Sequence, residues 1–66
     1  MFKENLFRAA LCEVGISIPE LAKKLSISKT TLYRKMNGES DFYRNEIQIV
    51  AEIIGKEKVD SIFFAR

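Results

Sequence analysis

The chain has 66 residues, of which 47% are hydrophobic and 30% are charged, and its formal net charge is +2. This length suits one small domain that spans residues 1–66, and the composition excludes a disordered chain, because disordered segments are poor in apolar residues. No run of about 18 apolar residues is present, which excludes a helix that crosses a membrane.

Four residues that favour turns divide the chain into short segments: Gly15, Pro19, Gly38 and Gly55. None of the segments alternates apolar and polar residues as a half-buried strand would, and most place apolar residues three and four positions apart. We therefore predict an all-α fold without a sheet. The first helix is expected from about Phe2 to Val14 and ends at Gly15. Its apolar stripe consists of Phe7, Ala10, Leu11 and Val14.

The second segment predicts a short helix, a tight turn and the start of another helix. Ser17 can cap the amide of Glu20, and the Glu20 carboxylate can return the bond to Ser17. After residues 25–27, Ser28 is a second N-cap that opens the next helix. We expect the apolar Ile27 to fill the core between two helices that cross steeply. That arrangement is the helix-turn-helix geometry.

The third helix is expected from Lys29 to Met36 and is closed by Asn37 and Gly38. A projection at about 100° per residue puts Leu32 and Met36 on one side, with Thr30, Arg34 and Asn37 on the other. A helix that reads DNA needs short polar and long cationic side chains on the face away from the core. Four residues meet that requirement: Lys29, Thr30, Thr31 and Arg34.

The stretch from Leu21 to Gly38 contains basic residues and no acid: Lys23, Lys24, Lys29, Arg34 and Lys35. A local basic patch is the expected footprint of groove and phosphate binding, and a solvated helix face has the same pattern. Two capped helices and an apolar turn residue within the same stretch favour DNA binding.

The fourth helix is expected at about Tyr43 to Ile54 and the last at about Glu57 to Phe64. We expect Phe42 to lie in the core, whereas the pattern leaves the role of Tyr43 open. Four apolar residues exceed what the stripes of these helices require: Ile49, Ile53, Phe63 and Phe64. They form a patch for a second copy of the chain, or the small core consumes them.

No group of residues suggests catalysis. With one cysteine and no histidine, the chain can assemble neither a metal site nor a Cys-His nucleophile, so we expect Cys12 to be a packing residue. The acids are expected on caps and exposed faces without pairing: Asp41, Glu46, Glu52, Glu57 and Asp60. We predict no enzyme activity, no cofactor and no metal. A lone cysteine without a signal peptide favours a reducing compartment, and we expect the cytoplasm.

The residues from Ser17 to Gly38, SIPELAKKLSISKTTLYRKMNG, resemble the Cro/CI (XRE) family of phage-type repressors. The likeness covers about residues 5–64, and the end, DSIFF, looks like that of small regulators from phages and prophages of Gram-positive bacteria. The resemblance implies a five-helix, lambda-repressor-like domain that binds operator DNA as a homodimer. Because the 66 residues leave room for one domain, we expect any dimer to form through it.

The resemblance also implies roles for individual residues. Lys29, Thr30 and Arg34 match base-contacting positions, and Asn37 and Arg44 match phosphate contacts. Apart from the resemblance, further backbone contacts are expected from Ser17, Lys24, Ser28 and Tyr33, with Ser40 and Asn45 as additional candidates. Tyr33 lies at the edge of the contact face, where it packs on a sugar or phosphate or covers the core.

Three features depart from the family pattern. Ile18 stands where many members have a glutamine that bonds a phosphate, and Ser26 stands where the turn usually has a glycine. Leu11 and Met36 replace a buried ion pair that some members have, so both are expected in the core.

The sequence therefore predicts a sequence-specific transcriptional regulator whose partner is double-stranded DNA, with no membrane or small-molecule partner. The rival interpretation is a protein-binding module of the same fold, such as an antirepressor or an accessory phage protein. Salt dependence separates the two, because DNA binding releases counterions and an apolar protein contact does not.

Overall fold

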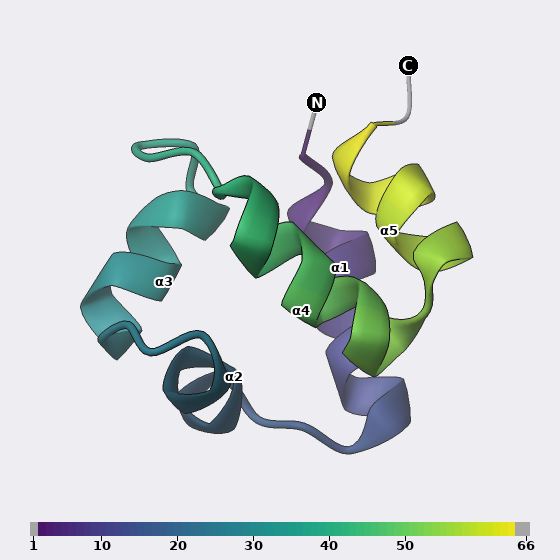
Figure 1. Cartoon of the computed structure of the whole chain (residues 1–66), viewed down its shortest axis with the longest axis horizontal. Helices are drawn as coiled ribbons and strands as arrows, with labels where there is room; N and C mark the ends of the chain where they lie inside the picture. Colours follow the sequence, from purple (N-terminus) through teal and green to yellow (C-terminus); the bar gives the residue numbers. More distant parts are fainter. Residues whose placement is uncertain (1, 65–66) are drawn as a thin grey trace.

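The structure is a computed structural model that describes residues 2–64, and these residues form five helices without a strand. The helices are α1 (Glu4–Val14), α2 (Ile18–Lys24), α3 (Lys29–Met36), α4 (Arg44–Ile54) and α5 (Lys56–Phe63). In Figure 1, α3 and α2 lie on one side of the molecule and α5 on the other, with α1 and α4 between them. The predicted all-α fold with a helix-turn-helix is confirmed.

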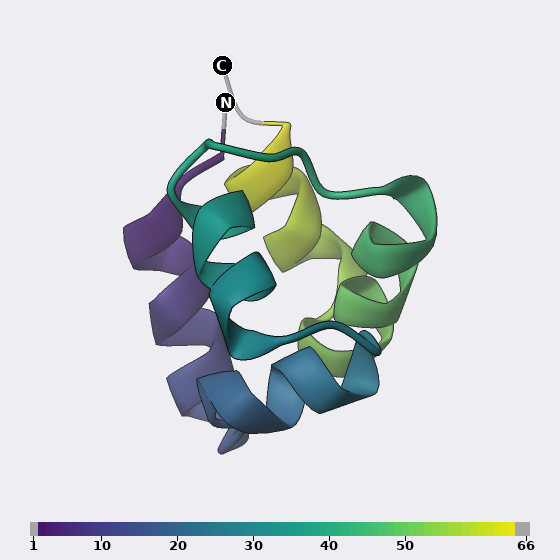
Figure 2. The ribbon, with the colours of Figure 1, turned by 90° about the vertical axis from the view of Figure 1, so that its left-hand side faces the viewer.

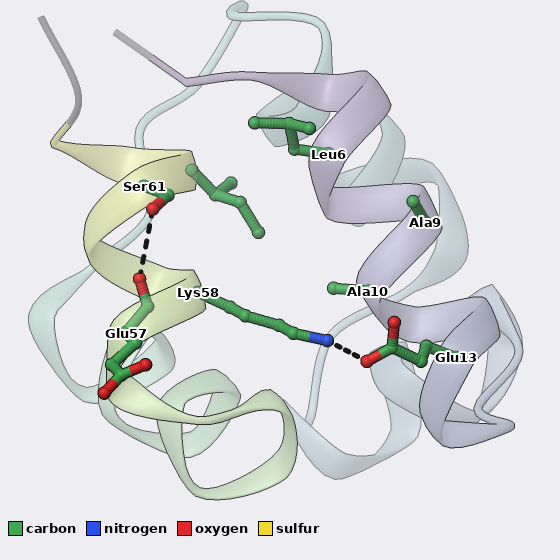
Figure 3. A pocket seen from close by; sticks show the side chains of 8 residues that line it. Leu6, Ala9, Ala10, Glu13, Glu57, Lys58 and Ser61 are labelled. Atoms are coloured by element: carbon green, nitrogen blue, oxygen red, sulfur yellow. Dashed lines mark hydrogen bonds and ion pairs between the residues drawn. The ribbon is translucent and has the colours of Figure 1, made fainter.

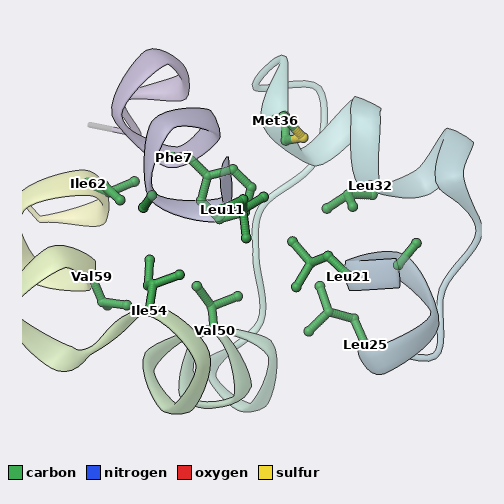
Figure 4. Packing of buried hydrophobic residues seen from close by; sticks show 12 residues of the cluster. Phe7, Leu11, Leu21, Leu25, Leu32, Met36, Val50, Ile54, Val59 and Ile62 are labelled. Atoms are coloured by element: carbon green, nitrogen blue, oxygen red, sulfur yellow. The ribbon is translucent and has the colours of Figure 1, made fainter. Parts of the chain in front are cut away.

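The core is a single cluster to which all five helices contribute. In Figure 4 the labelled side chains of the cluster point into one common interior. The fully buried side chains include Phe7, Leu21 and Leu32, so the predicted apolar stripes of the first three helices meet. Leu11 and Met36 are 2% and 3% exposed, which confirms that both lie in the core.

Four aromatic rings close the core at the end where the chain begins. The rings of Phe2, Phe7, Phe42 and Phe63 have centroids between 5.1 and 6.0 Å apart in every pairing. Aromatic pairs at such distances stabilise by more than their buried area alone. The expectation that Phe42 lies in the core is confirmed, although its side chain stays partly exposed.

Four helix boundaries differ from the prediction by one or two residues. The helix α1 begins at Glu4 and not at Phe2, because Lys3 is extended and its amide donates to the carbonyl of Ile62 in α5, at 2.9 Å. The helix α4 begins at Arg44 after Tyr43 as the N-cap residue. The last helix begins and ends one residue earlier than expected, at Lys56 and Phe63.

Two expectations about α1 were wrong. Cys12 is exposed and not a packing residue, because it lies on the side of α1 opposite the buried Phe7 and Ala10. Val14 continues the apolar stripe but is 42% exposed, since it is the last residue of the helix and the chain turns away at Gly15.

The turn between α2 and α3 holds Ser26 in the left-handed region, with a φ of 60°. For a residue with a Cβ atom, that conformation costs about 1–2 kcal/mol. We expect Ser26→Gly to raise the free energy of unfolding by about 0.5–1 kcal/mol, after the greater freedom of glycine in the unfolded chain is counted. Urea unfolding followed by circular dichroism measures the change.

The reverse substitution at another turn is the control for Ser26→Gly. Gly15 has a φ of 77°, and nothing lies within 4 Å of a Cβ built there, so Gly15→Ser adds backbone strain without a clash. Gly15→Ser should therefore lower stability. A Ser26→Gly variant that is no more stable than the native chain would mean that the serine side chain offsets its own strain.

Candidate nucleic-acid interface

The start of α2 is fixed by the predicted pair of hydrogen bonds. The amide of Ser17 donates to Oε1 of Glu20 at 3.1 Å, and the amide of Glu20 donates to the hydroxyl of Ser17 at 3.3 Å. The bond from the Ser17 amide lowers the pKa of the Glu20 carboxyl below its ordinary value. The capping box is confirmed, and it fixes the residue at which α2 begins.

The turn and the start of α3 are also as predicted. Ile27 is half-buried and packs against the core, which sets the crossing of α2 and α3. The hydroxyl of Ser28 accepts a hydrogen bond from the amide of Thr31 at 3.0 Å and donates to the Thr31 hydroxyl at 2.9 Å. The hydroxyls of Ser28 and Thr31 are therefore bonded to each other. Because Thr31 is also half-buried, it is less available for contact with a base than Lys29 and Thr30.

The helix α3 presents a polar face to solvent. Leu32 and Met36 are buried, and the predicted contact residues Lys29, Thr30 and Arg34 are exposed. Figure 2 views the molecule from this side, with α3 in front, α2 below it, α1 at the left and α4 at the right. Asn37, which follows the last residue of α3, is exposed as well. No other helix covers the front of α3 in this view.

Lys35 does not belong to the exposed basic surface. It is 4% exposed, and its ammonium lies 2.9 Å from Oε1 of Glu46, which is 3% exposed. The same nitrogen donates to the carbonyl of Asp41 at 3.0 Å and lies 4.1 Å from the centre of the Tyr43 ring. The expectation that Glu46 is an unpaired, exposed acid was wrong, and so was the grouping of Lys35 with the available cations.

This buried ion pair joins the end of α3 to the start of α4. Oε1 of Glu46 also accepts a hydrogen bond from the amide of Tyr43 at 2.8 Å. One carboxylate therefore binds both Lys35 and Tyr43. The loop of residues 37–43 is thereby fixed in its second half, at Asp41 and Tyr43. Tyr43, whose role the sequence left open, is 66% exposed, and Arg44 beside it is exposed too.

The remaining predicted backbone contacts surround α3. Ser17, Lys24 and Ser28 are exposed along α2 and the turn, as are the further candidates Ser40 and Asn45 near the start of α4. Ile18 is half-buried against the core, so this departure from the family pattern fills space and does not present a polar side chain.

Tyr33 lies at the flank of α3 that faces α1, where it is 41% exposed. The guanidinium of Arg8 stands over its ring, 5.9 Å from the centroid. Sequence reasoning missed Arg8. The only signal was the spacing of four residues from Glu4, with which Arg8 forms an ion pair at 2.8 Å.

The predicted patch for a second copy is largely used by the core. Ile49, Ile53 and Phe63 are partly buried and pack against the core cluster. Phe64 is 58% exposed and lies beside Phe63, with ring centroids 6.3 Å apart. A dimer interface at these four residues stays a prediction, and only Phe64 offers a large exposed apolar area for it.

Within residues 2–64, no group of three or more His, Cys, Asp or Glu side chains is arranged to hold a metal ion. None of the helices in the described part of the chain is long and apolar enough to span a bilayer.

A family model described as the helix-turn-helix domain of resolvase matches residues 9–39. The match runs from the second half of α1 through α2, the turn and the whole of α3. Neither the curated proteins nor the solved structures contain a significant match to the chain. The match does not identify the Cro/CI family in particular, so membership of that family stays a prediction from the sequence. Together with the geometry of α2 and α3, it supports a helix-turn-helix DNA-binding domain.

Proposed function

We propose that the protein is a sequence-specific transcriptional regulator of the Cro/CI type, which reads operator DNA by placing α3 in the major groove. Lys29, Thr30 and Arg34 contact base edges. Thr31 adds a base contact when its hydroxyl is released from Ser28. The observation that carries the proposal is the uncovered polar face of a capped α3 that follows α2 across a tight turn. Arginine and lysine bind guanine in the major groove, and threonine suits phosphate or a thymine methyl group.

The surroundings of α3 supply the contacts that set its register on the duplex. Exposed side chains suited to phosphate oxygens lie along α2 and beyond the end of α3: Ser17, Lys24, Ser28, Asn37 and Arg44. Such contacts position a protein on DNA, whereas base contacts specify the sequence. One α3 covers few base pairs, and we therefore propose that two copies bind successive major grooves of a palindromic operator.

Selection from a randomised duplex library, at about 50 and 200 mM salt, tests this function. We expect an enriched palindromic motif whose binding weakens steeply between the two salt concentrations, because each neutralised phosphate releases counterions. Sedimentation of the complex with the enriched duplex gives the number of bound copies. Absence of any enrichment would contradict the proposal and would favour a protein-binding module with the same fold.

A further inference from the structure

We propose that Arg8 of α1 binds a DNA phosphate at the edge of the groove that α3 enters, and that Glu4 competes with the phosphate for it. The inference rests on the proposed function and adds a contact from a helix outside the helix-turn-helix. The Arg8 guanidinium lies over the Tyr33 ring, 5.9 Å from the centroid.

The Arg8 guanidinium has more N–H donors than its hydrogen bonds within residues 2–64 use. Its Nε donates to Oε2 of Glu4 at 2.8 Å, and this is its one hydrogen bond to an acceptor within residues 2–64. A guanidinium carries five N–H donors in a planar fork, and the fork matches two oxygens of a phosphate. The Arg8 side chain is 46% exposed, so the terminal donors are accessible to a ligand.

The dimensions of the groove place Arg8 near the backbone. The major groove of B-DNA is about 12 Å wide, and a helix with its side chains is about 10–12 Å across. When α3 lies in the groove, its two flanks therefore face the two sugar-phosphate strands. Tyr33 lies on the flank toward α1, because Arg8 of α1 stands over its ring. The loop that follows α3 passes the end of that helix and reaches α4 on the opposite flank (Figure 2).

The bond to Glu4 is too weak to prevent the exchange of partners. Glu4 and Arg8 are four residues apart on one helix, and both side chains are well exposed, at 36% and 46%. Exposed pairs of this kind favour the paired state by a factor of about two. A hydrogen bond between a guanidinium and a phosphate is worth roughly tenfold or more. The contact with the Tyr33 ring then keeps the guanidinium beside α3 during the exchange.

The chain offers a matched control on its opposite side. Lys58 of α5 pairs with Glu13 of α1 across a groove lined by residues of both helices (Figure 3). The Lys58 side chain is 40% exposed, close to the value for Arg8. Since α5 lies on the far side of the molecule from α3, substitutions there change the net charge without a change at the proposed contact.

The test measures binding to a random-sequence duplex and to the selected operator between about 50 and 200 mM salt. Arg8→Gln should reduce the slope of log K against log salt by about 0.9 per bound subunit, and it should lower affinity roughly tenfold on both duplexes. Arg8→Lys keeps the charge and should keep the slope. Lys58→Gln should leave the slope at the native value, and circular dichroism verifies that all variants are folded.

The acidic partners supply an independent readout. Glu4→Gln releases Arg8 and should raise affinity about twofold beyond any gain in Glu13→Gln, which removes the same charge elsewhere. Equal slopes for Arg8→Gln and Lys58→Gln would overturn the phosphate contact while leaving the proposed function intact. A native protein without salt-dependent DNA binding would instead overturn the function, and this inference with it.

Discussion

Lys35→Met is expected to lower the free energy of unfolding by about 3–5 kcal/mol, because it leaves the buried carboxylate of Glu46 without its cation. Both side chains are 4% exposed, so water cannot replace the lost partner without opening the structure. For a chain of 66 residues, a typical total stability is about 3–10 kcal/mol. Urea unfolding followed by circular dichroism should show a transition shifted to low urea, or a chain already unfolded in part.

The control for Lys35→Met is the same substitution at an exposed lysine. Lys23 lies in the last turn of α2 and is exposed, so Lys23→Met removes an equal charge without orphaning a partner. We expect Lys23→Met to change the stability by less than about 0.5 kcal/mol. Similar losses in the two variants would contradict the assignment of Lys35 and Glu46 as a stabilising buried pair.

The double variant Lys35→Met/Glu46→Leu separates stability from positioning. It replaces two buried charges with apolar side chains of similar size, which is often neutral or stabilising. We therefore expect it to recover most of the stability that Lys35→Met loses. The Asp41 carbonyl still lacks its donor, and the Tyr43 amide now also loses the Glu46 acceptor, so the loop before Arg44 is less restrained. A recovered variant with native DNA affinity would show that the pair does not position this loop for binding.

The helix-turn-helix could be predicted because its signals are local. Ser17 and Glu20 are three residues apart, and so are Ser28 and Thr31, hence each cap is decided within one turn of chain. The apolar stripe of α3 has the same property, since Leu32 and Met36 repeat at the helical period. Ile27 was placed correctly by its contrast with the polar residues around it.

The Lys35–Glu46 pair could not be predicted, because nothing local links two residues eleven positions apart. In a projection of α3, Lys35 lies between the buried and exposed faces, and lysine occupies such positions with its stem packed and its charge in water. Only the packing of α4 against the core turns the Lys35 charge inward, toward Glu46 and Asp41. The contact of Arg8 with Tyr33 was missed for the same reason, since it depends on how α1 crosses α3.

Arg34→Ala is expected to weaken binding to the selected operator by about 1–3 kcal/mol, which is the usual value of a bidentate contact with guanine. Arg34 is exposed on the polar face of α3, one turn beyond Thr30, and its main chain already binds the loop through the amide of Glu39 at 2.9 Å. The substitution leaves that main-chain bond in place. Fluorescence anisotropy with the operator and with a random duplex measures both affinities at one salt concentration.

The comparison between the two duplexes decides what Arg34 does. Only the operator places a guanine opposite Arg34 in every complex, so the loss there should exceed the loss on random DNA, and the ratio of the operator affinity to the random-DNA affinity should fall. Arg34→Lys retains the charge but not the planar fork, and it should therefore recover binding to random DNA more fully than binding to the operator. Equal losses on both duplexes would instead assign Arg34 to a phosphate, and base recognition by α3 would then depend on Lys29 and Thr30.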